Sequence, residues 1–568
     1  MTIVEQTRLS VKPQSAKQWL RNGDPFIWLN AAAVSISVVA VVGLLLLLAV
    51  RGFGHFWPSD VLQAQYALPG QPVKTIIGEV VESEQVSLEQ LKSAGVNLDS
   101  DSLFITRSLI KQGNRDVSGM DFAWIIEDFV SDKTYPEDIM AIERREWGNF
   151  YGYLKTVKES GNIVVTENTW AEFQTRIQRA LQIHNDIETI EKGDIGAINY
   201  QIERLRLAGR SLELKNNISA ADKALAQADI ATTRAELDQR YAVLQEQLVT
   251  LYQQINRDSF IAETMSGAEV EIPLAVVVHA YQPNGMNVLQ KSVAYLEKFW
   301  EFLSDEPREA NTEGGIFPAI FGTVMMVLLM SVMVTPFGVV AAVYLREYAR
   351  QGLMTRIIRI AVNNLAGVPS IVYGVFGLGF FIYFLGAEID KALFPAALPA
   401  PTFGTPGLLW ASLTLALLTL PVVIVATEEG LSRIPKALRE GSLALGATKA
   451  ETLWRVVLPM ASPAMMTGLI LAVARAAGEV APLMLVGVVK LAPSLPVDGN
   501  YPYMHLDQKF MHLGFHIYDV GFQSPNVEAA RPLVYATALL LVVIIALLNF
   551  SAVALRNHLR EKYKSLEM

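Results

Sequence analysis

The 568-residue sequence contains no cysteine. This absence excludes a disulfide framework and cysteine-ligated metal sites, and it is compatible with an oxidising compartment without proving one. The sequence also lacks a G-x-x-x-x-G-K-[ST] stretch, the loop whose backbone amides cradle nucleotide phosphates. Any ATP hydrolysis on which the protein depends must therefore take place on another polypeptide, and we expect this chain to hold no metal and no cofactor.

The formal net charge of −9 conceals two regions of opposite sign. The range 59–313, called the acidic region below, holds 40 acidic and 24 basic residues, whereas the rest of the chain has a net charge of +7. A large acidic surface argues against nucleic-acid binding. Because hydrophobic residues make up 51% of the chain, we expect a solvated acidic domain attached to an apolar membrane body.

Six apolar stretches are long enough to cross the hydrocarbon core, which needs about 20 mainly apolar residues. They are Phe26–Val50, Gly315–Tyr344, Ile357–Leu385, Leu408–Thr427, Pro463–Val489 and Leu533–Val553. The first stretch is too long and uninterrupted for a cleaved signal peptide, so we interpret 26–50 as an uncleaved signal anchor. The sequence therefore predicts an α-helical integral membrane protein with six transmembrane helices.

The distribution of lysine and arginine predicts the orientation in the membrane. If residues 1–25 are cytoplasmic, the cytoplasmic segments hold 17 of the 23 basic residues outside the acidic region, and the outer segments hold five. An even number of spans then makes the tail 557–568 cytoplasmic as well. Residues 51–313 are expected to form an extracytoplasmic α+β domain.

Within this domain, strand-like and helical patterns alternate. The strand-like runs are Thr75–Val81, Ser102–Arg107, Asn162–Thr166 and Ile272–Tyr281. Heptad-like spacing of apolar residues occurs at Ile198, Ile202, Leu205 and Leu212, and again at Leu237, Tyr241, Leu244, Leu248, Leu251 and Ile255. Ser219 is able to cap a new helix between the two runs.

These helical patterns predict an antiparallel hairpin over about 176–256. A parallel coiled coil between two chains is the alternative. Gly193, Gly196 and Gly209 disfavour a long, straight coiled coil, because glycine is a poor helix former.

A short pattern in the last cytoplasmic loop, 429–460, resembles the EAA loop of ABC-importer permeases. That family's pattern is Glu-Ala-Ala, three residues, Gly, nine residues and Ile-x-Leu-Pro. The matching positions here are Glu440, Gly441, Ser442, Gly446, Val456, Leu458 and Pro459. The spacing is complete, and the departures are glycine and serine for the two alanines and valine for isoleucine.

The residues around this pattern predict a helix–turn–helix at the membrane surface. Pro435 suits the first position of a helix, and Gly446 is able to end it with a positive φ. Thr448 and Glu451 then form a capping-box pattern for a second helix. An ordinary amphipathic re-entry loop is the alternative.

Three further stretches make the chain similar to the A-type permease subunits of phosphate-specific ABC importers over about 314–556. The first extends from Gly314-Gly-Ile-Phe to Tyr344-Leu-Arg-Glu-Tyr and includes Thr335-Pro-Phe-Gly. The others are Gly367-Val-Pro-Ser-Ile-Val and Ala474-Arg-Ala-Ala-Gly-Glu-Val-Ala-Pro-Leu. The resemblance implies a type I ABC-importer permease fold in the bacterial inner membrane and a transport role without enzymatic activity.

The resemblance also implies partners. These are a second phosphate permease subunit, two ATP-binding subunits that press on the EAA loop, and a periplasmic phosphate-binding protein. Some members of this family carry a long insert after the first span. The chain would contact membrane lipid and no nucleic acid, and its partners would use the ATP.

Arg475 and Glu479 interrupt the fifth apolar stretch. Counted from Pro463, Arg475 lies about 18 Å into a core of about 30 Å, where a charge costs roughly 3 kcal/mol. The i, i+4 spacing puts both side chains on one helix face. Arginine binds an oxyanion bidentately, and glutamate accepts a hydrogen bond from protonated phosphate but repels fully ionised sulfate.

We therefore expect Arg475 and Glu479 to line the substrate pathway, with a self-neutralising intrahelical ion pair as the alternative. Ser370 is a third candidate, because Gly367 and Pro369 are able to distort the helix and bring its hydroxyl to the pathway. The same residues fit an ordinary packing kink.

Two other functions remain open from the sequence. The chain could be a membrane scaffold or sensor for phosphate signalling, in which the loop recruits a signalling protein. It could also be a permease for another oxyanion, such as sulfate, molybdate or phosphonate.

Overall fold

The computed structural model describes residues 20–21, 23–68, 70–93, 103–215, 218–524 and 527–563. Most of the predicted N-terminal segment 1–25 lies outside the described residues, as do positions 216–217 of the hairpin and the last five residues of the tail 557–568. Six helices have the length and apolar composition of membrane spans. They are Pro25–Gly54, Phe317–Tyr348, Ser370–Leu393, Leu408–Arg433, Lys449–Ala477 and Ala530–Glu561.

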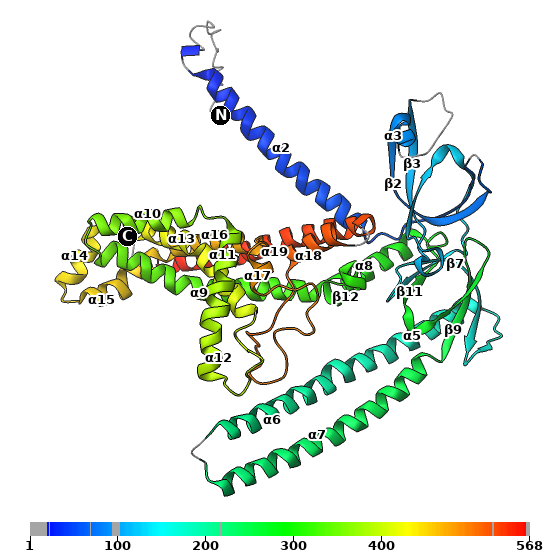
Figure 1. The fold of residues 1–568 in the computed structure, drawn as a ribbon. Helices are drawn as coiled ribbons and strands as arrows, with labels where there is room; N and C mark the ends of the chain where they lie inside the picture. The colour runs from blue at the N-terminus through cyan, green and yellow to red at the C-terminus, as the bar shows by residue number, and fades with distance from the viewer. Residues whose placement is uncertain are drawn as a thin grey trace, which may run out of the picture.

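The first helix, α2 (Asp24–Gly54), stands apart from the other spans (Figure 1). It contacts the last helix, α19 (Val527–Tyr563), near its own C-terminal end. There Gly52 allows a close approach, because a Cβ at this position would lie 3.1 Å from the Tyr535 carbonyl oxygen. The apolar side chains of α2 are otherwise exposed, as lipid-facing side chains of a span would be.

The acidic region contains two antiparallel sheets. The first has the order β4-β3-β2-β1-β5 and consists of β1 (Val61–Tyr66), β2 (Lys74–Ser87), β3 (Phe104–Lys111), β4 (Phe122–Ile126) and β5 (Val130–Thr134). The second has the order β10-β9-β7-β6-β11, with β8 beside β7. Its strands are β6 (Met140–Arg144), β7 (Phe150–Glu159), β8 (Asn162–Ile163), β9 (Asp258–Glu263), β10 (Glu269–Pro273) and β11 (Val277–Tyr281).

The predicted strands are present with two differences. The run Asn162–Thr166 contributes only the two-residue β8, and the run Ile272–Tyr281 is divided by the 3-10 turn Leu274–Val276. Leu274 is fully buried in the core shared with the hairpin. Leu274 in the turn is apolar because it packs in the same core as the strands on either side. The hydrophobic pattern of Ile272–Tyr281 therefore does not reveal the interruption.

A helical hairpin emerges from the second sheet (Figure 1). One arm is α5 (Thr169–Glu188), the π-helical turn η2 (Thr189–Ile195) and α6 (Gly196–Leu214), and the returning arm is α7 (Ala220–Ile255). The two arms pack against each other within the chain, as the antiparallel reading predicted. Ser219 caps α7 by accepting a hydrogen bond from the Asp222 amide at 3.1 Å.

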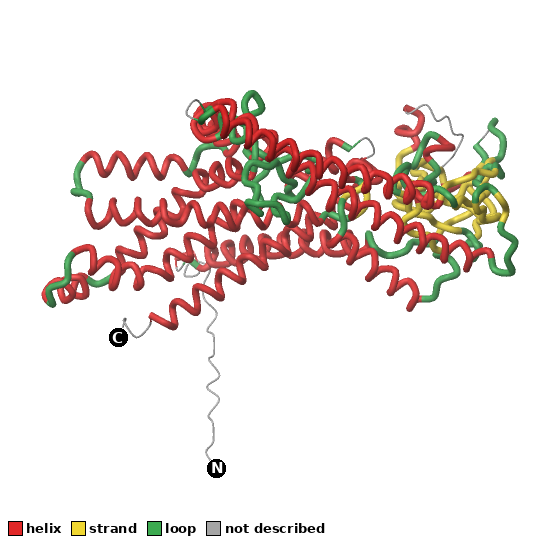
Figure 2. The backbone as a smooth tube through the Cα atoms, turned by 90° about the horizontal axis from the view of Figure 1, so that it is seen from below, coloured by secondary structure: helices red, strands yellow, loops and turns green. Residues whose placement is uncertain are grey.

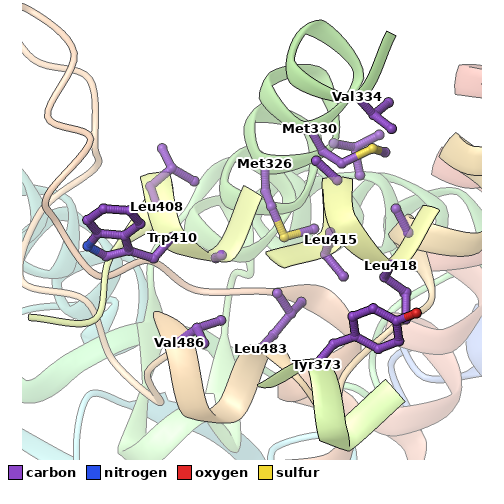
Figure 3. Packing of buried hydrophobic residues seen from close by; sticks show 14 of the residues in the cluster. Met326, Met330, Val334, Tyr373, Leu408, Trp410, Leu415, Leu418, Leu483 and Val486 are labelled. Atoms are coloured by element: carbon purple, nitrogen blue, oxygen red, sulfur yellow. The ribbon is translucent and has the colours of Figure 1, made fainter. Parts of the chain in front are cut away.

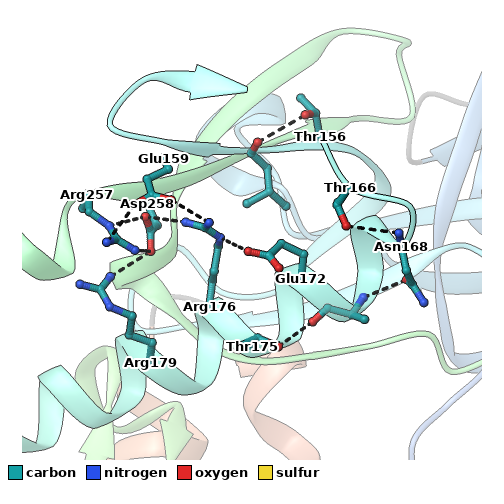
Figure 4. Close-up of polar contacts among 12 residues, drawn as sticks. Thr156, Glu159, Thr166, Asn168, Glu172, Thr175, Arg176, Arg179, Arg257 and Asp258 are labelled. Carbon is teal, nitrogen blue, oxygen red and sulfur yellow. Dashed lines mark hydrogen bonds and ion pairs between the residues drawn. The ribbon is translucent and has the colours of Figure 1, made fainter. Parts of the chain in front are cut away.

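Charged residues fasten the hairpin to the sheet (Figure 4). Asp258 at the start of β9 is almost fully buried and pairs with Arg176 at 2.9 Å, Arg179 at 3.0 Å and Arg257 at 2.8 Å. Arg176 also pairs with Glu159 at 2.8 Å. A buried carboxylate needs such compensation, so this cluster fixes the direction in which the hairpin leaves the sheet.

The acidic region leads into the membrane body through α8 (Val288–Ser304) and the small strands β12 (Pro307–Arg308) and β13 (Glu313–Gly314). From there α9 (Phe317–Val343) and the π-helical turn η5 (Tyr344–Tyr348) run the length of the body. Figure 2 shows the sheets at one end and the long helices of the body extending from them. The two sheets of the acidic region and the C-terminal end of α9 therefore lie at opposite ends of the molecule.

The body is built around α9, α13 (Leu408–Arg433) and α16 (Leu458–Ala477). Its core includes Met326, Met330, Leu415, Leu418 and Leu483 (Figure 3). Glycines bring the helices close together. A Cβ on Gly338 would lie 2.5 Å from a Val423 methyl carbon, and one on Gly468 would lie 2.6 Å from the Ala426 methyl carbon. Small residues commonly allow such packing between membrane helices.

The predicted third span, Ile357–Leu385, is wrong in its start. The structure has a separate helix α10 (Leu353–Leu365), a break, and then the candidate span 370–393, which consists of α11 (Ser370–Phe376), η6 (Gly377–Gly386) and α12 (Ala387–Leu393). Pro369 precedes α11 with φ −55° and ψ 136°. Proline disfavours helix in the preceding residue and lacks the amide that a continuing helix needs.

The predicted fifth span, Pro463–Val489, is wrong at both ends. Its helix is continuous with α15 (Lys449–Thr452) and the π-helical turn η7 (Leu453–Val457), and it ends at Ala477. The chain then forms the short helix α17 (Leu483–Val486), a long loop, α18 (Leu513–Tyr518) and η8 (Asp519–Gln523). Gly478 and Pro482 follow the helix end, a common position for both residue types.

Candidate functional site

The 429–460 loop forms the predicted helix–turn–helix. α14 (Lys436–Ala444) follows Pro435, which occupies the N-cap with ψ 138° rather than the first helical position. Gly446 has φ +88°, the left-handed conformation that favours glycine. Thr448 then caps α15, and its capping box with Glu451 is complete. Local chemistry therefore specifies the whole turn.

The matched residues of this loop divide into an exposed group and an anchored group. Glu440 and Gly441 are exposed, and nothing lies within 4 Å of the position that a Gly441 Cβ would occupy. Ser442 is half-buried, and its hydroxyl oxygen lies 2.9 Å from that of Thr452, which ties α14 to α15. Leu458 and Pro459 begin α16, which continues into the body.

Large apolar side chains are exposed on and beside the same loop. Leu445 is 91% exposed and Trp454 is 74% exposed. Exposed apolar side chains beside small residues form a surface suited to a protein partner. The loop thus has a firm attachment to α16 and an open outer face.

Arg475 and Glu479 are brought together at the opposite end of α16. Arg475 Nε lies 3.4 Å from Glu479 Oε1, and the two side chains are 34% and 19% exposed. The helix ends between them. The Gly478 and Glu479 amides donate to the carbonyls of Arg475 and Ala476, three residues earlier, and not to the carbonyls four residues earlier that an α-helix would use. The prediction of one continuous helix face is therefore wrong, and the contact between the two side chains is the ion pair that the sequence analysis gave as the alternative.

The position of Arg475 along the helix also differs from the prediction. The residue lies in the last turn of α16, which is 20 residues and so about 30 Å long. A cation in the last turn also interacts favourably with the helix dipole. Within the described residues, only Nε of Arg475 makes a hydrogen bond, so both terminal nitrogens of the guanidinium remain available for a ligand.

The segment that follows α16 packs against α11 and η6. A Cβ on Gly374 would lie 2.7 Å from Cα of Pro482, and one on Gly377 would lie 2.9 Å from a methyl carbon of Val486. Ser370 is the first residue of α11 and is half-buried. The structure therefore places Ser370 on the helix that faces the Arg475–Glu479 segment. Discontinuous membrane helices of this kind often surround transport sites.

Two buried polar features near this junction were not predicted. The Tyr373 hydroxyl donates to the Leu365 carbonyl at 2.6 Å across the α10–α11 break, and Tyr373 lies within electrostatic range of Arg475. His512 lies beside Val480 across Gly514, and its Nε2 is buried without a hydrogen-bond partner among the described residues. A single tyrosine or histidine outside any motif does not predict from the sequence that its side chain is buried at this junction.

A cavity lies in another part of the molecule. It has a volume of about 720 Å³ and is bounded by the end of α2, the first sheet, the 308–315 segment and the start of α19. Charged residues line it, including Lys111, Glu143, Lys298 and Glu313. Burial raises the pKa of Glu313 to about 7. No group of three or more histidine, aspartate or glutamate side chains in the described part of the chain is arranged to hold a metal ion.

Comparison with known proteins identifies relatives of the membrane body. Residues 334–565 match the family described as "Binding-protein-dependent transport system inner membrane component". The chain is 35% identical over 244 residues to phosphate transport system permease protein PstA 1 of Mycobacterium tuberculosis (strain H37Rv), covering 43% of this chain and 70% of that protein. It is 28% identical over 253 residues to a probable PstA of Methanocaldococcus jannaschii, covering 44% and 79%.

Solved structures match over a similar share of the chain. The MetNI methionine ABC transporter in an inward-facing conformation matches with 19% identity and a TM-score of 0.31, covering 42% of this chain and 94% of that chain. A bacterial ABC transporter that imports alginate matches with 14% identity and a TM-score of 0.33, covering 46% and 83%.

Proposed function

Because this chain belongs to the family of PstA-type phosphate transport permeases, we propose that it is a membrane subunit of an ATP-driven importer of inorganic phosphate. The observation that best supports this proposal is what lies at the two ends of α16. One end continues into the 429–460 loop, and the other end presents Arg475 and Glu479 beside a second broken helix. A single rigid element thus joins a partner-binding surface to a charged pair.

Partner proteins supply what this chain lacks. A second permease would complete the pathway, two ATPase subunits would seat on the exposed face of the loop, and a binding protein would deliver phosphate. We place the loop and both chain termini in the cytoplasm of a bacterium, and residues 51–313 outside the inner membrane. The excess of basic residues in the proposed cytoplasmic segments supports this orientation.

Arg475 and Glu479 have complementary roles in this proposal. The free terminal nitrogens of Arg475 would bind two phosphate oxygens bidentately. Glu479 would accept a hydrogen bond from the protonated oxygen that monobasic and dibasic phosphate carry and that sulfate lacks. A carboxylate facing fully ionised sulfate costs free energy, so selectivity arises from an unfavourable contact. Ser370 would offer a hydroxyl from the adjoining helix.

Uptake of radiolabelled phosphate by the assembled transporter tests these roles. We expect Arg475→Gln and Glu479→Gln to abolish high-affinity uptake while membrane insertion stays intact. Glu479→Gln should also weaken discrimination against sulfate, measured by competition. Arg356→Gln is the matched control, because Arg356 is an exposed arginine of α10. Uptake at the wild-type rate in both test variants would refute the assignment.

A further inference from the structure

A mostly buried ion pair joins the loop to a helix that the sequence pattern does not include. Arg439 of α14 lies 2.9 Å from Glu347 of η5, through Nη2 and Oε1. The two side chains are only 19% and 13% exposed. Arg439 also donates to the carbonyls of Leu431 at 2.8 Å and Ile434 at 2.9 Å. This pair is therefore unlike exposed surface pairs, which contribute little.

The second helix of the loop contacts the same segment of η5. Lys449 at the start of α15 donates to the Glu347 carbonyl at 2.5 Å. Its ammonium group also lies 4.3 Å from the centre of the Tyr348 ring, a cation–π arrangement. Both halves of the helix–turn–helix are thus attached to two consecutive residues at the end of α9.

The flanks of the loop pack against α9 and η5 through apolar side chains. Leu431, Ile434, Leu453 and Val457 share a buried cluster with Ala342 and Leu345. The short helices α14 and α15 themselves are held mainly by polar contacts. No residue of α14 is buried, and Thr452 is the only buried residue of α15. α9 in turn packs along α13 and α16 through the body. The loop therefore connects to the body through its continuation into α13 and α16, through the apolar packing of its flanks, and through the polar contacts of α14 and α15 with η5.

We propose that Arg439 is a positioning residue for energy coupling, which makes the loop and α9 move as one unit when ATPase subunits close. The inference rests on the proposed function and assigns a new residue to it. Without the guanidinium group, the loop would still be able to drive α16, but α14 would lose its ion pair with η5 and would follow α9 less closely. Two-state coupling between sites typically corresponds to a factor of about 5 to 150.

Transport measured against ATP hydrolysis tests this role in the assembled, reconstituted complex. Arg439→Gln and Glu347→Gln should each lower the phosphate imported per ATP hydrolysed at least about fivefold. The reversed pair Arg439→Glu with Glu347→Arg should recover coupling that each single reversal loses. Arg356→Gln should couple like the wild type. Normal coupling in Arg439→Gln would overturn the proposal.

A second measurement does not depend on phosphate. Because the chain contains no cysteine, a single cysteine in place of exposed Arg346 of η5 reports on this segment alone. Nucleotide should change its rate of thiol labelling in the assembled complex, and Arg439→Gln should remove that change. An unaltered response in Arg439→Gln would overturn the positioning role.

The two measurements separate the two proposals. Failure of the wild-type complex to import phosphate would refute the proposed function while leaving the labelling experiment interpretable. Normal import together with an unaltered labelling response in Arg439→Gln would refute the positioning role alone.

Discussion

Glu313 of β13 is a titratable residue whose pKa is raised by its buried environment. It lies at the entrance of the body and lines the 720 Å³ cavity. Burial is the largest cause of its raised pKa of about 7, Glu143 and Glu309 raise it further, and Lys111 and Arg308 oppose the shift. The neutral carboxyl group therefore fits the folded protein better than the carboxylate does.

This raised pKa predicts a pH dependence of stability. The folded state binds the proton more tightly than the unfolded chain, whose glutamate titrates near 4.5. The contribution of Glu313 is therefore fully present below pH 4.5 and is lost as pH rises through about 7, with an upper limit of about 3 kcal/mol. Glu313→Gln should flatten the fall in unfolding temperature over this range.

Thermal unfolding of the purified chain in detergent, measured across that pH range, checks this prediction. The difference between wild type and Glu313→Gln isolates Glu313 from other groups. His279 is one such group, because its hydrogen bond with Glu301 helps to raise its pKa against the effect of burial. Parallel pH curves for the two proteins would contradict the prediction.

Individual residues also show what sequence reasoning was able to predict. The spacing of Arg475 and Glu479 allowed a contact between them, which the sequence analysis named as the alternative to a role in the pathway, because residues four apart meet on a helix. It did not predict that the helix ends between them, since a helix end depends on tertiary packing against α11 as much as on Gly478. Tyr373 and His512 were missed because only the fold brings them to the junction.

At the scale of elements, the turn between α14 and α15 was predictable because it is local. Pro435, Gly446 and the Thr448–Glu451 capping box act within a few residues of one another. The bounds predicted for the third and fifth spans were wrong. A run of apolar residues indicates that a segment is suited to the membrane, but it does not show whether the helix is continuous. Near Pro369 and Gly478 the helix is interrupted, although the neighbouring residues in the sequence remain mainly apolar.

The same turn gives a prediction about coupling. Gly446 has φ +88°, where a residue with a Cβ is strained by about 1–2 kcal/mol. Gly446→Asp and Gly446→Val should therefore displace α15 and uncouple ATP hydrolysis from phosphate import. Gly446→Asn should retain more coupling, because asparagine tolerates the left-handed conformation better. The ratio of phosphate imported to ATP hydrolysed measures the series.

Equal loss in all three Gly446 variants would point to the surface of the turn rather than to its backbone conformation. Normal transport in Gly446→Asp would show that this loop does not carry the coupling. Membrane levels of each variant, measured in parallel, distinguish uncoupling from failed insertion.

At the scale of the whole molecule, the hairpin returns to the membrane body. Tyr200 of α6 donates a hydrogen bond to the Tyr501 carbonyl in the long loop before α18, and its ring lies 5.7 Å from that of His505. Arg204 lies over the Tyr501 ring at 5.7 Å. The heptad spacing predicted the hairpin but not this contact, because the partner residues are about 300 positions away in the sequence.

The arrangement of the whole chain predicts a topology that thiol labelling is able to test. The body separates the 429–460 loop from the acidic region, whose net charge of −16 opposes burial in a membrane. A cysteine at Thr448 should react with an impermeant maleimide only after the cells are permeabilised. A cysteine at Leu225, which is 76% exposed on α7, should react in spheroplasts with an intact inner membrane.

Because the wild-type chain has no thiol, each signal belongs to one introduced position. Labelling of both cysteines from the same side would require an even number of crossings between 225 and 448. The orientation assigned here places spans 317–348, 370–393 and 408–433 between those positions, which is itself an odd number. Opposite sides are therefore the only outcome compatible with all three helices crossing, and same-side labelling would mean that at least one of them does not span the membrane.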